Sequence, residues 1–389
     1  MVPSSEISRR LAQLQEKLRQ SQLDGALILQ GADLLYYTGC RQNGVLWVPA
    51  EGDPVFLVRR SLSRAQEDSP LTDFRSLNSR ELKAVIGSEK KRIGTTLDVL
   101  PVQLYKFYTS LFPQAELVDI SRIVREQRSV KSPWEIARMR EGAAAMKKVF
   151  ALIPSLLQTG KREIEVAAAI EYHARLAGHE GYVRMRAFNQ ELFMGYVLSG
   201  RQAPLPSFFD GPTGGRGLSP SWPHGPSAAV IQPNTPVLID YGWVHRGYIV
   251  DMTRIFVCGS LAPHLEKAFQ VALDIQAAVV ARLKPGVKTG ELYDLAREMA
   301  AAAGLADHFM GPPGEQAAFV GHGVGLELDE LPVLARGSEE SLQEGQVVAL
   351  EPKFSFPGEG VVGIENTFLV TTGGGEKITD LSDDIVVIK

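Results

Sequence analysis

Residues 237–257 read VLIDYGWVHRGYIVDMTRIFV, and this stretch decides the fold of the second half of the chain. Two apolar runs, which carry Asp240 and Asp251, lie on either side of a short polar turn. Such runs predict a pair of antiparallel strands. Because side chains alternate along a strand, Asp251 shares a face with Thr253, and we expect that threonine to orient the carboxylate by a hydrogen bond.

A second pair of predicted strands repeats this form. It reads QVVALEPKFSF (346–356) and GIENTFLVT (363–371), with Glu351 ending one apolar run and Glu365 followed two residues later by Thr367. We expect Thr367 to orient Glu365 in the same way. A single acid of this kind is better explained as a solvated strand end. Four acids in two matching pairs favour a shared site.

Carboxylates in apolar strands are expensive to bury, because an unpaired buried charge costs several kcal/mol. Apart from Arg254, the sequence offers few Lys or Arg residues that look buried and could neutralise these acids. Divalent metal ions are therefore the predicted counter-charge. His322 lies between glycines in VGHGVG (320–325) and supplies a nitrogen donor. Mostly oxygen donors suit Mn²⁺, Co²⁺ or Fe²⁺ better than a closed structural zinc.

The remaining patterns predict two domains. An amphipathic helix at 5–21, a strand at 25–31 and a hairpin at 45–59 indicate an α/β domain over residues 1–125. A charged linker at 124–131 precedes Ser132-Pro133-Trp134-Glu135, which predicts a capping box and a helix over 133–157. Further helices are predicted among the strands, over 162–177, 263–283 and 290–304. Thr289 is the predicted cap of the last one. Residues 132–389 are therefore expected to form an α+β domain.

The stretch between Gly200 and His224 is rich in Pro, Gly and Ser and is too long for a neutral turn. It predicts an irregular loop, either a lid beside a site or a surface insertion. Phe208, Phe209 and Trp222 on this loop could cover an apolar substrate group, although loop aromatics also serve as packing residues.

Composition excludes several classes of partner. The hydrophobic share is 44%, the charged share 22% and the net charge −4, typical of a globular protein with no electrostatic footprint for nucleic acid. No apolar run is long enough to span a membrane, and the N-terminus lacks a secretory signal. Cys40 and Cys258 are far apart and read as reduced thiols. A cytoplasmic protein is expected.

Taken together, LIDYG, GYIVDMTR, GHGVGLELDE, ALEP and GIENT resemble the metal-ligand motifs of the pita-bread metallopeptidases, family M24. That group includes methionine aminopeptidases, Xaa-Pro aminopeptidases, prolidases and creatinase. RLAQLQEKLRQSQLDGALIL and LLYYTG resemble the creatinase-type N-terminal domain, so the likeness covers nearly the whole chain. It implies a creatinase-like α/β domain followed by a pita-bread catalytic domain, cleavage of the peptide bond before proline, and a homodimer.

The resemblance also assigns roles. The five implied ligands of two divalent ions, Mn²⁺ first with Co²⁺, Fe²⁺ or Zn²⁺ as alternatives, are Asp240, Asp251, His322, Glu351 and Glu365. Such an ion pair lowers the pKa of a shared water, which attacks the carbonyl carbon before proline. Glu351 is expected to take the proton of that water. His224 is expected to hydrogen-bond the substrate as a catalytic histidine.

Two positions depart from the family pattern. Asp329 stands where the family has a second His, and Gly363 stands where an Arg precedes the last ligand Glu. In prolidase-like members those groups hold the substrate, so the resemblance does not extend to strict dipeptidase activity. Asp329 is expected to contact a substrate amine or cation. The departures leave an alternative reading, a hydrolase or lyase that breaks C–N or C–S bonds of non-peptide substrates on the creatinase fold. A non-catalytic binding relative is the third reading, although the complete ligand set argues against it.

Overall fold

The structure is a computed structural model that describes residues 1–186, 188–189 and 191–388. The chain divides into two compact units, Met1–Arg128 and Ser129–Lys389, and the predicted linker at 124–131 brackets this division. Within the described ranges, no helix combines the length and the apolar character that a membrane crossing needs.

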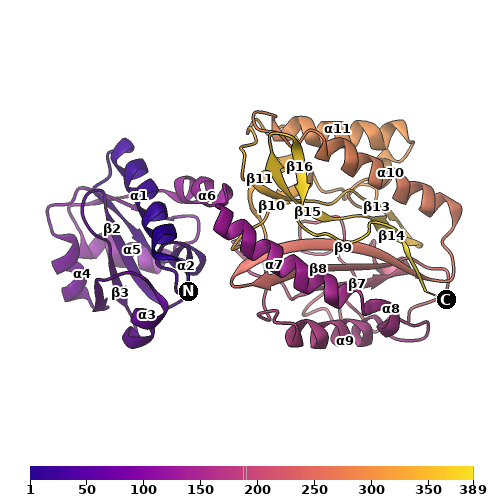
Figure 1. The fold of residues 1–389 in the computed structure, drawn as a ribbon, viewed down its shortest axis with the longest axis horizontal. Helices are drawn as coiled ribbons and strands as arrows, with labels where there is room; N and C mark the ends of the chain where they lie inside the picture. The colour runs from indigo at the N-terminus through magenta and orange to yellow at the C-terminus, as the bar shows by residue number, and fades with distance from the viewer. Residues whose placement is uncertain (187, 190, 389) are drawn as a thin grey trace. The chain divides into compact units, whose positions relative to one another are not determined.

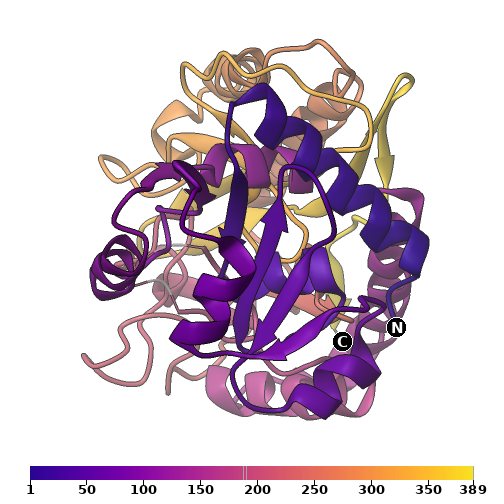
Figure 2. The same ribbon diagram turned by 90° about the vertical axis from the view of Figure 1, so that its left-hand side faces the viewer.

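A six-stranded mixed sheet with strand order β4-β3-β2-β1-β5-β6 forms the centre of the N-terminal unit (Figure 2). The predicted hairpin is present, since β2 and β3 pair antiparallel from Gly44↔Val58 to Trp47↔Val55. The strands are β1 Gly25–Ile28, β2 Gly44–Pro49, β3 Val55–Val58, β4 Phe74–Ser76, β5 Arg92–Thr95 and β6 Glu116–Asp119.

Helices cover both faces of this sheet. Leu27 and Trp47 form one apolar cluster with Leu82 of α4 and Tyr108 of α5, whereas α1 and α2 contact β2. Both faces are therefore buried, as the prediction of an α/β unit requires. The helices are α1 Ser4–Gln20, α2 Gly31–Thr38, α3 Leu62–Asp68, α4 Ser79–Ile86, α5 Val102–Leu111 and α6 Ser121–Ser129.

The strands of the second unit form a five-stranded sheet (β11-β10-β12-β15-β16), a four-stranded sheet (β17-β9-β8-β7) and the pair β13-β14. The predicted strand pair at 237–257 is the long antiparallel pair β8–β9. The strands are β7 Gly195–Ser199, β8 Val237–His245, β9 Tyr248–Cys258, β10 Phe319–Gly323, β11 Glu330–Ala335, β12 Val347–Leu350, β13 Lys353–Phe356, β14 Gly360–Gly363, β15 Asn366–Thr371, β16 Gly374–Lys377 and β17 Val386–Ile388.

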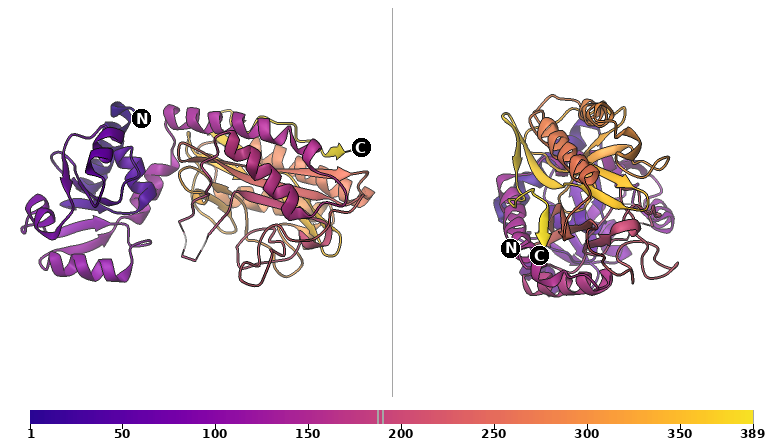
Figure 3. Two further views of the ribbon diagram at one scale, coloured as in Figure 1. Left: turned by 90° about the horizontal axis from the view of Figure 1, so that it is seen from below. Right: turned by 90° about the vertical axis from the view of Figure 1, so that its right-hand side faces the viewer.

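Helices pack on the outer faces of these strands (Figure 1). α7 contacts β8 and β9, and α9 contacts β7; both are visible as magenta helices in Figure 3. α10 packs on β13 and β14, and α11 packs on β11. The helices are α7 Pro133–Phe150, α8 Ile153–Leu156, α9 Glu163–Leu176, α10 Pro263–Val280 and α11 Thr289–Ala302, with 3₁₀ turns η1 Gly200–Gln202 and η2 Ala306–His308.

The capping box that begins α7 is confirmed, because the Ser132 hydroxyl accepts from the Glu135 backbone N–H and the Glu135 carboxylate accepts from that of Ser132. Three local predictions are wrong. The charged linker at 124–131 is largely helical, within α6. The helix predicted over 133–157 ends at Phe150 and is followed by the separate turn α8. Thr289 is the first helical residue rather than the cap, and its hydroxyl bonds the Ser338 hydroxyl.

Candidate metal centre

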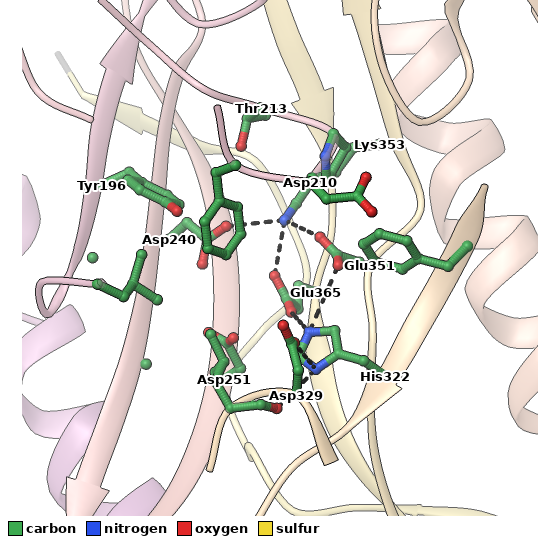
Figure 4. Close-up of a pocket in the computed structure, with 18 of the residues that line it drawn as sticks. Tyr196, Asp210, Thr213, Asp240, Asp251, His322, Asp329, Glu351, Lys353 and Glu365 are labelled. Carbon is green, nitrogen blue, oxygen red and sulfur yellow. Dashed lines mark hydrogen bonds and ion pairs between the residues drawn. The ribbon is translucent and has the colours of Figure 1, made fainter. Parts of the chain in front are cut away.

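Five strands bring the predicted donors together. Asp240 and Asp251 lie on β8 and β9, where Asp240 is opposite Thr253. His322 lies on β10, which pairs with β12, and Glu351 directly follows β12. Glu365 directly precedes β15, and a bridge to Thr253 ties it to β9. All five side chains are at least nine-tenths buried and line one cavity (Figure 4).

Sequence reasoning missed the cation at the middle of this cluster, Lys353. Its ammonium nitrogen lies 2.9 Å from Asp240 Oδ2, 2.7 Å from Glu351 Oε2 and 2.9 Å from Glu365 Oε2 (Figure 4). Its side chain is only 1% exposed. The expectation of few buried cations other than Arg254 therefore overlooks Lys353. Arg254 bonds the backbone oxygens of Thr253 and Glu365.

The imidazole of His322 lies on the other side of the cluster. Its Nδ1 faces the carbonyl oxygen of Leu328 at 3.0 Å and Oδ1 of Asp329 at 3.3 Å, while Nε2 faces Glu351 and Glu365 at 3.7 and 4.0 Å. Acceptors on Nδ1 favour a proton there and leave Nε2 as a metal donor, as in many metal-bound histidines. Asp329, expected to meet substrate, contacts His322 in this structure.

The donor atoms on this side fit a divalent cation. Ligand atoms of Asp251, His322 and Glu365 lie within 4.8 Å of one another, and the second carboxylate oxygen of Glu351 faces the same imidazole nitrogen. Donors about 2.0–2.2 Å from one ion are separated by roughly 4 Å at most, so small side-chain shifts bring these atoms onto it. Three carboxylates and one imidazole are a donor set for Mn²⁺, Fe²⁺, Co²⁺ or Zn²⁺.

The two threonines bond across the site rather than along their own strands. The Thr253 hydroxyl donates to Glu365 Oε2 at 2.8 Å, and the Thr367 hydroxyl donates to the backbone oxygen of Asp251 at 2.9 Å. The prediction that each threonine orients the acid two residues before it is wrong. Thr253 instead holds the carboxylate of Glu365, and Thr367 holds the backbone of Asp251, so each threonine connects the two strand pairs.

Burial and repulsion shift the titration of these groups. Burial raises the pKa of Asp251 well above its ordinary value, and the Glu365 and Asp240 charges add to the shift. Burial also raises the pKa of Asp240, although the Lys353 ammonium opposes this. Burial alone would lower the pKa of Lys353, yet Asp240, Glu351 and Glu365 raise it well above 10.5. Positive charge in this cluster is therefore electrostatically favourable.

His224 does not line the cavity. Its ring is buried, with Nε2 2.8 Å from the Tyr196 hydroxyl and Nδ1 2.8 Å from the Ser207 hydroxyl, and Phe209 stacks on it. Burial lowers the pKa of His224 to about 4, so it is neutral at neutral pH. Tyr196, which sequence reasoning missed, lines the cavity and connects it to His224. The catalytic role of His224 stays a prediction, and any direct contact with substrate requires movement of Tyr196 or Phe209.

The irregular loop forms one wall of the cavity through Phe209, Asp210 and Thr213. Its two ends are held by Glu163, whose carboxylate accepts from the backbone N–H groups of Ser199 and Ser227 at 2.6 and 2.9 Å. Phe208 is not part of the wall; it is 48% exposed and contacts Trp222 and His224. The cavity volume is about 50 Å³, room for a few water molecules.

Gly363, the second departure from the family pattern, lies opposite Lys353 in the β13–β14 pair. A Cβ atom at this position would lie 2.6 Å from Lys353 Cα and 2.8 Å from its Cγ. A side chain at 363 is therefore incompatible with the observed path of Lys353. The observed path of Lys353 thus requires a glycine at position 363.

Known proteins resemble the chain over its whole length. Peptidase YqhT of Bacillus subtilis is 28% identical over 97% of this chain and 100% of its own. A Xaa-Pro dipeptidase of Pyrococcus furiosus is 28% identical over 98% of this chain and 100% of its own. The crystal structure of dipeptidase PepE from Mycobacterium ulcerans is 26% identical, with a TM-score of 0.81 over 99% of this chain and 98% of that one.

The structure of a Xaa-Pro dipeptidase from Bacillus anthracis, at 24% identity and a TM-score of 0.84 over 98% of this chain and 99% of that one, shares the fold. The expected architecture, a creatinase-type N-terminal domain followed by a pita-bread domain, is thus confirmed. The profile of the creatinase/prolidase N-terminal domain matches residues 10–130, and that of metallopeptidase family M24 matches residues 137–372, so the chain belongs to metallopeptidase family M24.

Proposed function

We propose that the protein is a metal-dependent peptidase that cleaves the peptide bond before proline. The observation that carries this proposal is the cavity lined by Asp240, Asp251, His322, Glu351 and Glu365. The family membership and the relatives named Xaa-Pro dipeptidase support the substrate class. A divalent ion held by these donors would act as a Lewis acid and lower the pKa of water.

The residues around the donors suit a proline peptide. Apolar side chains form part of the wall, including Phe209, Phe319 and Leu328, and can pack against the proline ring. Glu351 is proposed to accept a proton from the attacking water. The Tyr196 hydroxyl, held by neutral His224, can donate to charge that develops on the substrate.

The wall offers little to bind the carboxylate of a dipeptide. Among its described lining residues, Lys353 and His322 are the cationic or titratable bases, and both are engaged with acids. Gly363 removes the arginine expected from the family pattern. We therefore propose an aminopeptidase-type preference for peptides longer than dipeptides.

Three finer properties belong to the same proposal. Mn²⁺ is the first candidate metal, with Co²⁺, Fe²⁺ or Zn²⁺ as alternatives. The five donors suit two ions if Lys353 leaves the cluster and one ion if it stays. A cytoplasmic location is supported by Cys40 and Cys258, which are both free thiols. A homodimer is the assembly that the family likeness implies.

The test is hydrolysis of matched peptides, Ala-Pro-Ala, Ala-Pro and Ala-Ala-Ala, by chain loaded with Mn²⁺. We expect cleavage of the two proline peptides, faster for the tripeptide, and loss of cleavage in Asp251→Asn. Cleavage of non-peptide amides but not of either proline peptide would instead support the second candidate, a C–N hydrolase on this fold. That candidate is favoured because the described residues of the wall include no cation that is free of an acidic partner.

A further inference from the structure

Lys353 competes directly with a second metal ion for the same oxygen atoms. Its ammonium group contacts one oxygen each of Asp240, Glu351 and Glu365, at 2.7–2.9 Å. A second ion bound by Asp240 and Glu365 would need those lone pairs. An ammonium ion and a divalent cation cannot occupy this position together.

The first ion has its own donors on the opposite side. Asp251, His322 and Glu365 offer ligand atoms within 4.8 Å of one another, and Glu351 Oε1 faces His322 Nε2 at 3.7 Å. Glu351 and Glu365 thus turn one oxygen toward the ammonium and the other toward the imidazole. Asp240 is not part of that donor group; its carboxylate contacts the Lys353 ammonium group and the Thr253 hydroxyl.

Lys353 is built into the fold at this position. Its stem passes over Gly363, where any Cβ atom would collide with its Cα and Cγ atoms. Its side chain is 1% exposed, so moving the ammonium away would break three ion pairs of a buried charge, which is strongly unfavourable.

Contact between cations, rather than net charge, distinguishes the one-ion from the two-ion arrangement. The four carboxylates carry four negative charges. One divalent ion and the ammonium group supply three positive charges, whereas two divalent ions and the ammonium would leave a buried positive excess. Buried excess charge of either sign is unfavourable, but only the second arrangement also forces two cations into contact.

We propose that the Lys353 ammonium group takes the place of the second metal ion, so that each chain binds one divalent ion at Asp251, His322, Glu351 and Glu365. Asp240 is then a positioning residue for Lys353 rather than a metal ligand. The inference rests on the proposed metal site and is independent of the substrate. It revises the expectation of two ions per chain.

The test is the metal content of the full-length chain, stripped with a chelator, reloaded with Mn²⁺ and freed of unbound ion. We expect one Mn²⁺ per chain by elemental analysis and the electron paramagnetic resonance spectrum of an isolated ion. Two tightly bound ions per wild-type chain, with the spectrum of a coupled pair, would overturn the proposal. This measurement needs no variant and no activity.

Variants then separate the roles of the carboxylates. Asp240→Asn should change Mn²⁺ affinity by less than about tenfold, whereas Asp251→Asn should weaken it by more than about 100-fold. Lys353→Ala should bind two ions, and its matched control Lys131→Ala, which removes another buried lysine of the same unit, should still bind one. Loss of the only bound ion in Asp240→Asn would contradict the proposal. A chain that binds one ion but cleaves no proline peptide would refute the proposed function and leave this inference standing.

Discussion

The hydroxyl of Thr253 orients one carboxylate of the proposed metal site. It donates to the Glu365 carboxylate and is fully buried. In Thr253→Val the shape is kept and the hydrogen bond is lost, so Glu365 is less well oriented. We expect Mn²⁺ affinity to fall by about 10–100-fold, measured by titration against a competing chelator.

Thr289 provides the control for this variant. It is also fully buried in the second unit, and its hydroxyl bonds Ser338 rather than a residue of the centre. Thr289→Val should therefore leave Mn²⁺ affinity unchanged. Equal affinity in both variants would mean that Thr253 does not orient the ligand.

His224 predicts a pH dependence of stability. Its pKa is lowered by burial from 6.5 to about 4, so between these pH values the unfolded chain binds a proton that the folded chain does not. The free energy of unfolding should therefore fall as the pH is lowered through this window, by up to about 3 kcal/mol, and be fully retained above pH 6.5.

Urea unfolding of wild type and His224→Gln between pH 4 and 7.5 isolates this contribution. Glutamine does not titrate, so the difference in unfolding free energy between the two proteins should change across the window. A constant difference would show that His224 is protonated in the folded state as readily as in water.

The four acidic donors could be found from sequence because each lies within or directly beside an apolar strand, where an unpaired carboxylate is costly. The position of Lys353 could also have been predicted from the sequence. Residues two apart share a strand face, so reading 346–356 as strand places Lys353 beside Glu351, a consequence that the sequence prediction missed. The hydrogen bond from Thr253 to Glu365 could not be predicted, because it depends on how two separate strand pairs align.

At the scale of elements, the β13–β14 pair fixes the path of Lys353. Gly363→Ala would place a Cβ atom 2.6 Å from Lys353 Cα and from the Pro352 backbone oxygen. The strands must separate to accept it, so we expect the unfolding free energy to fall by about 1–3 kcal/mol in urea denaturation.

Gly373→Ala is the control for Gly363→Ala. The nearest atom to a Cβ there is 3.7 Å away. Its stability should change by no more than about 0.5 kcal/mol. A Gly363→Ala protein as stable as this control would show that the β13–β14 pair tolerates a side chain beside Lys353.

Element types were predictable where the pattern was strong, as for α1 and the β8–β9 pair. Breaks within elements were harder to predict. The stretch predicted as one strand over 346–356 is divided between β12 and β13 at Glu351 and Pro352. This division lets β12 pair with β15 while β13 pairs with β14, a choice that depends on tertiary packing.

For the whole molecule, the centre belongs entirely to the second unit, and its four carboxylates outnumber the single ammonium group of Lys353. Metal binding should therefore stabilise that unit, by about 2.7 kcal/mol when the free ion is at a hundred times its dissociation constant. Chelation should lower the thermal midpoint of wild type and have little effect on Asp251→Asn. An equal fall in both proteins would place the stabilising ion elsewhere.

The most direct test of the account is a titration of chelated wild-type chain with Mn²⁺ while hydrolysis of Ala-Pro-Ala is followed. The account predicts no cleavage without metal and a rate that rises linearly and levels off at one ion per chain. A break at two ions would contradict the role assigned to Lys353. Absence of cleavage at every metal loading would contradict the assignment as a peptidase that acts before proline.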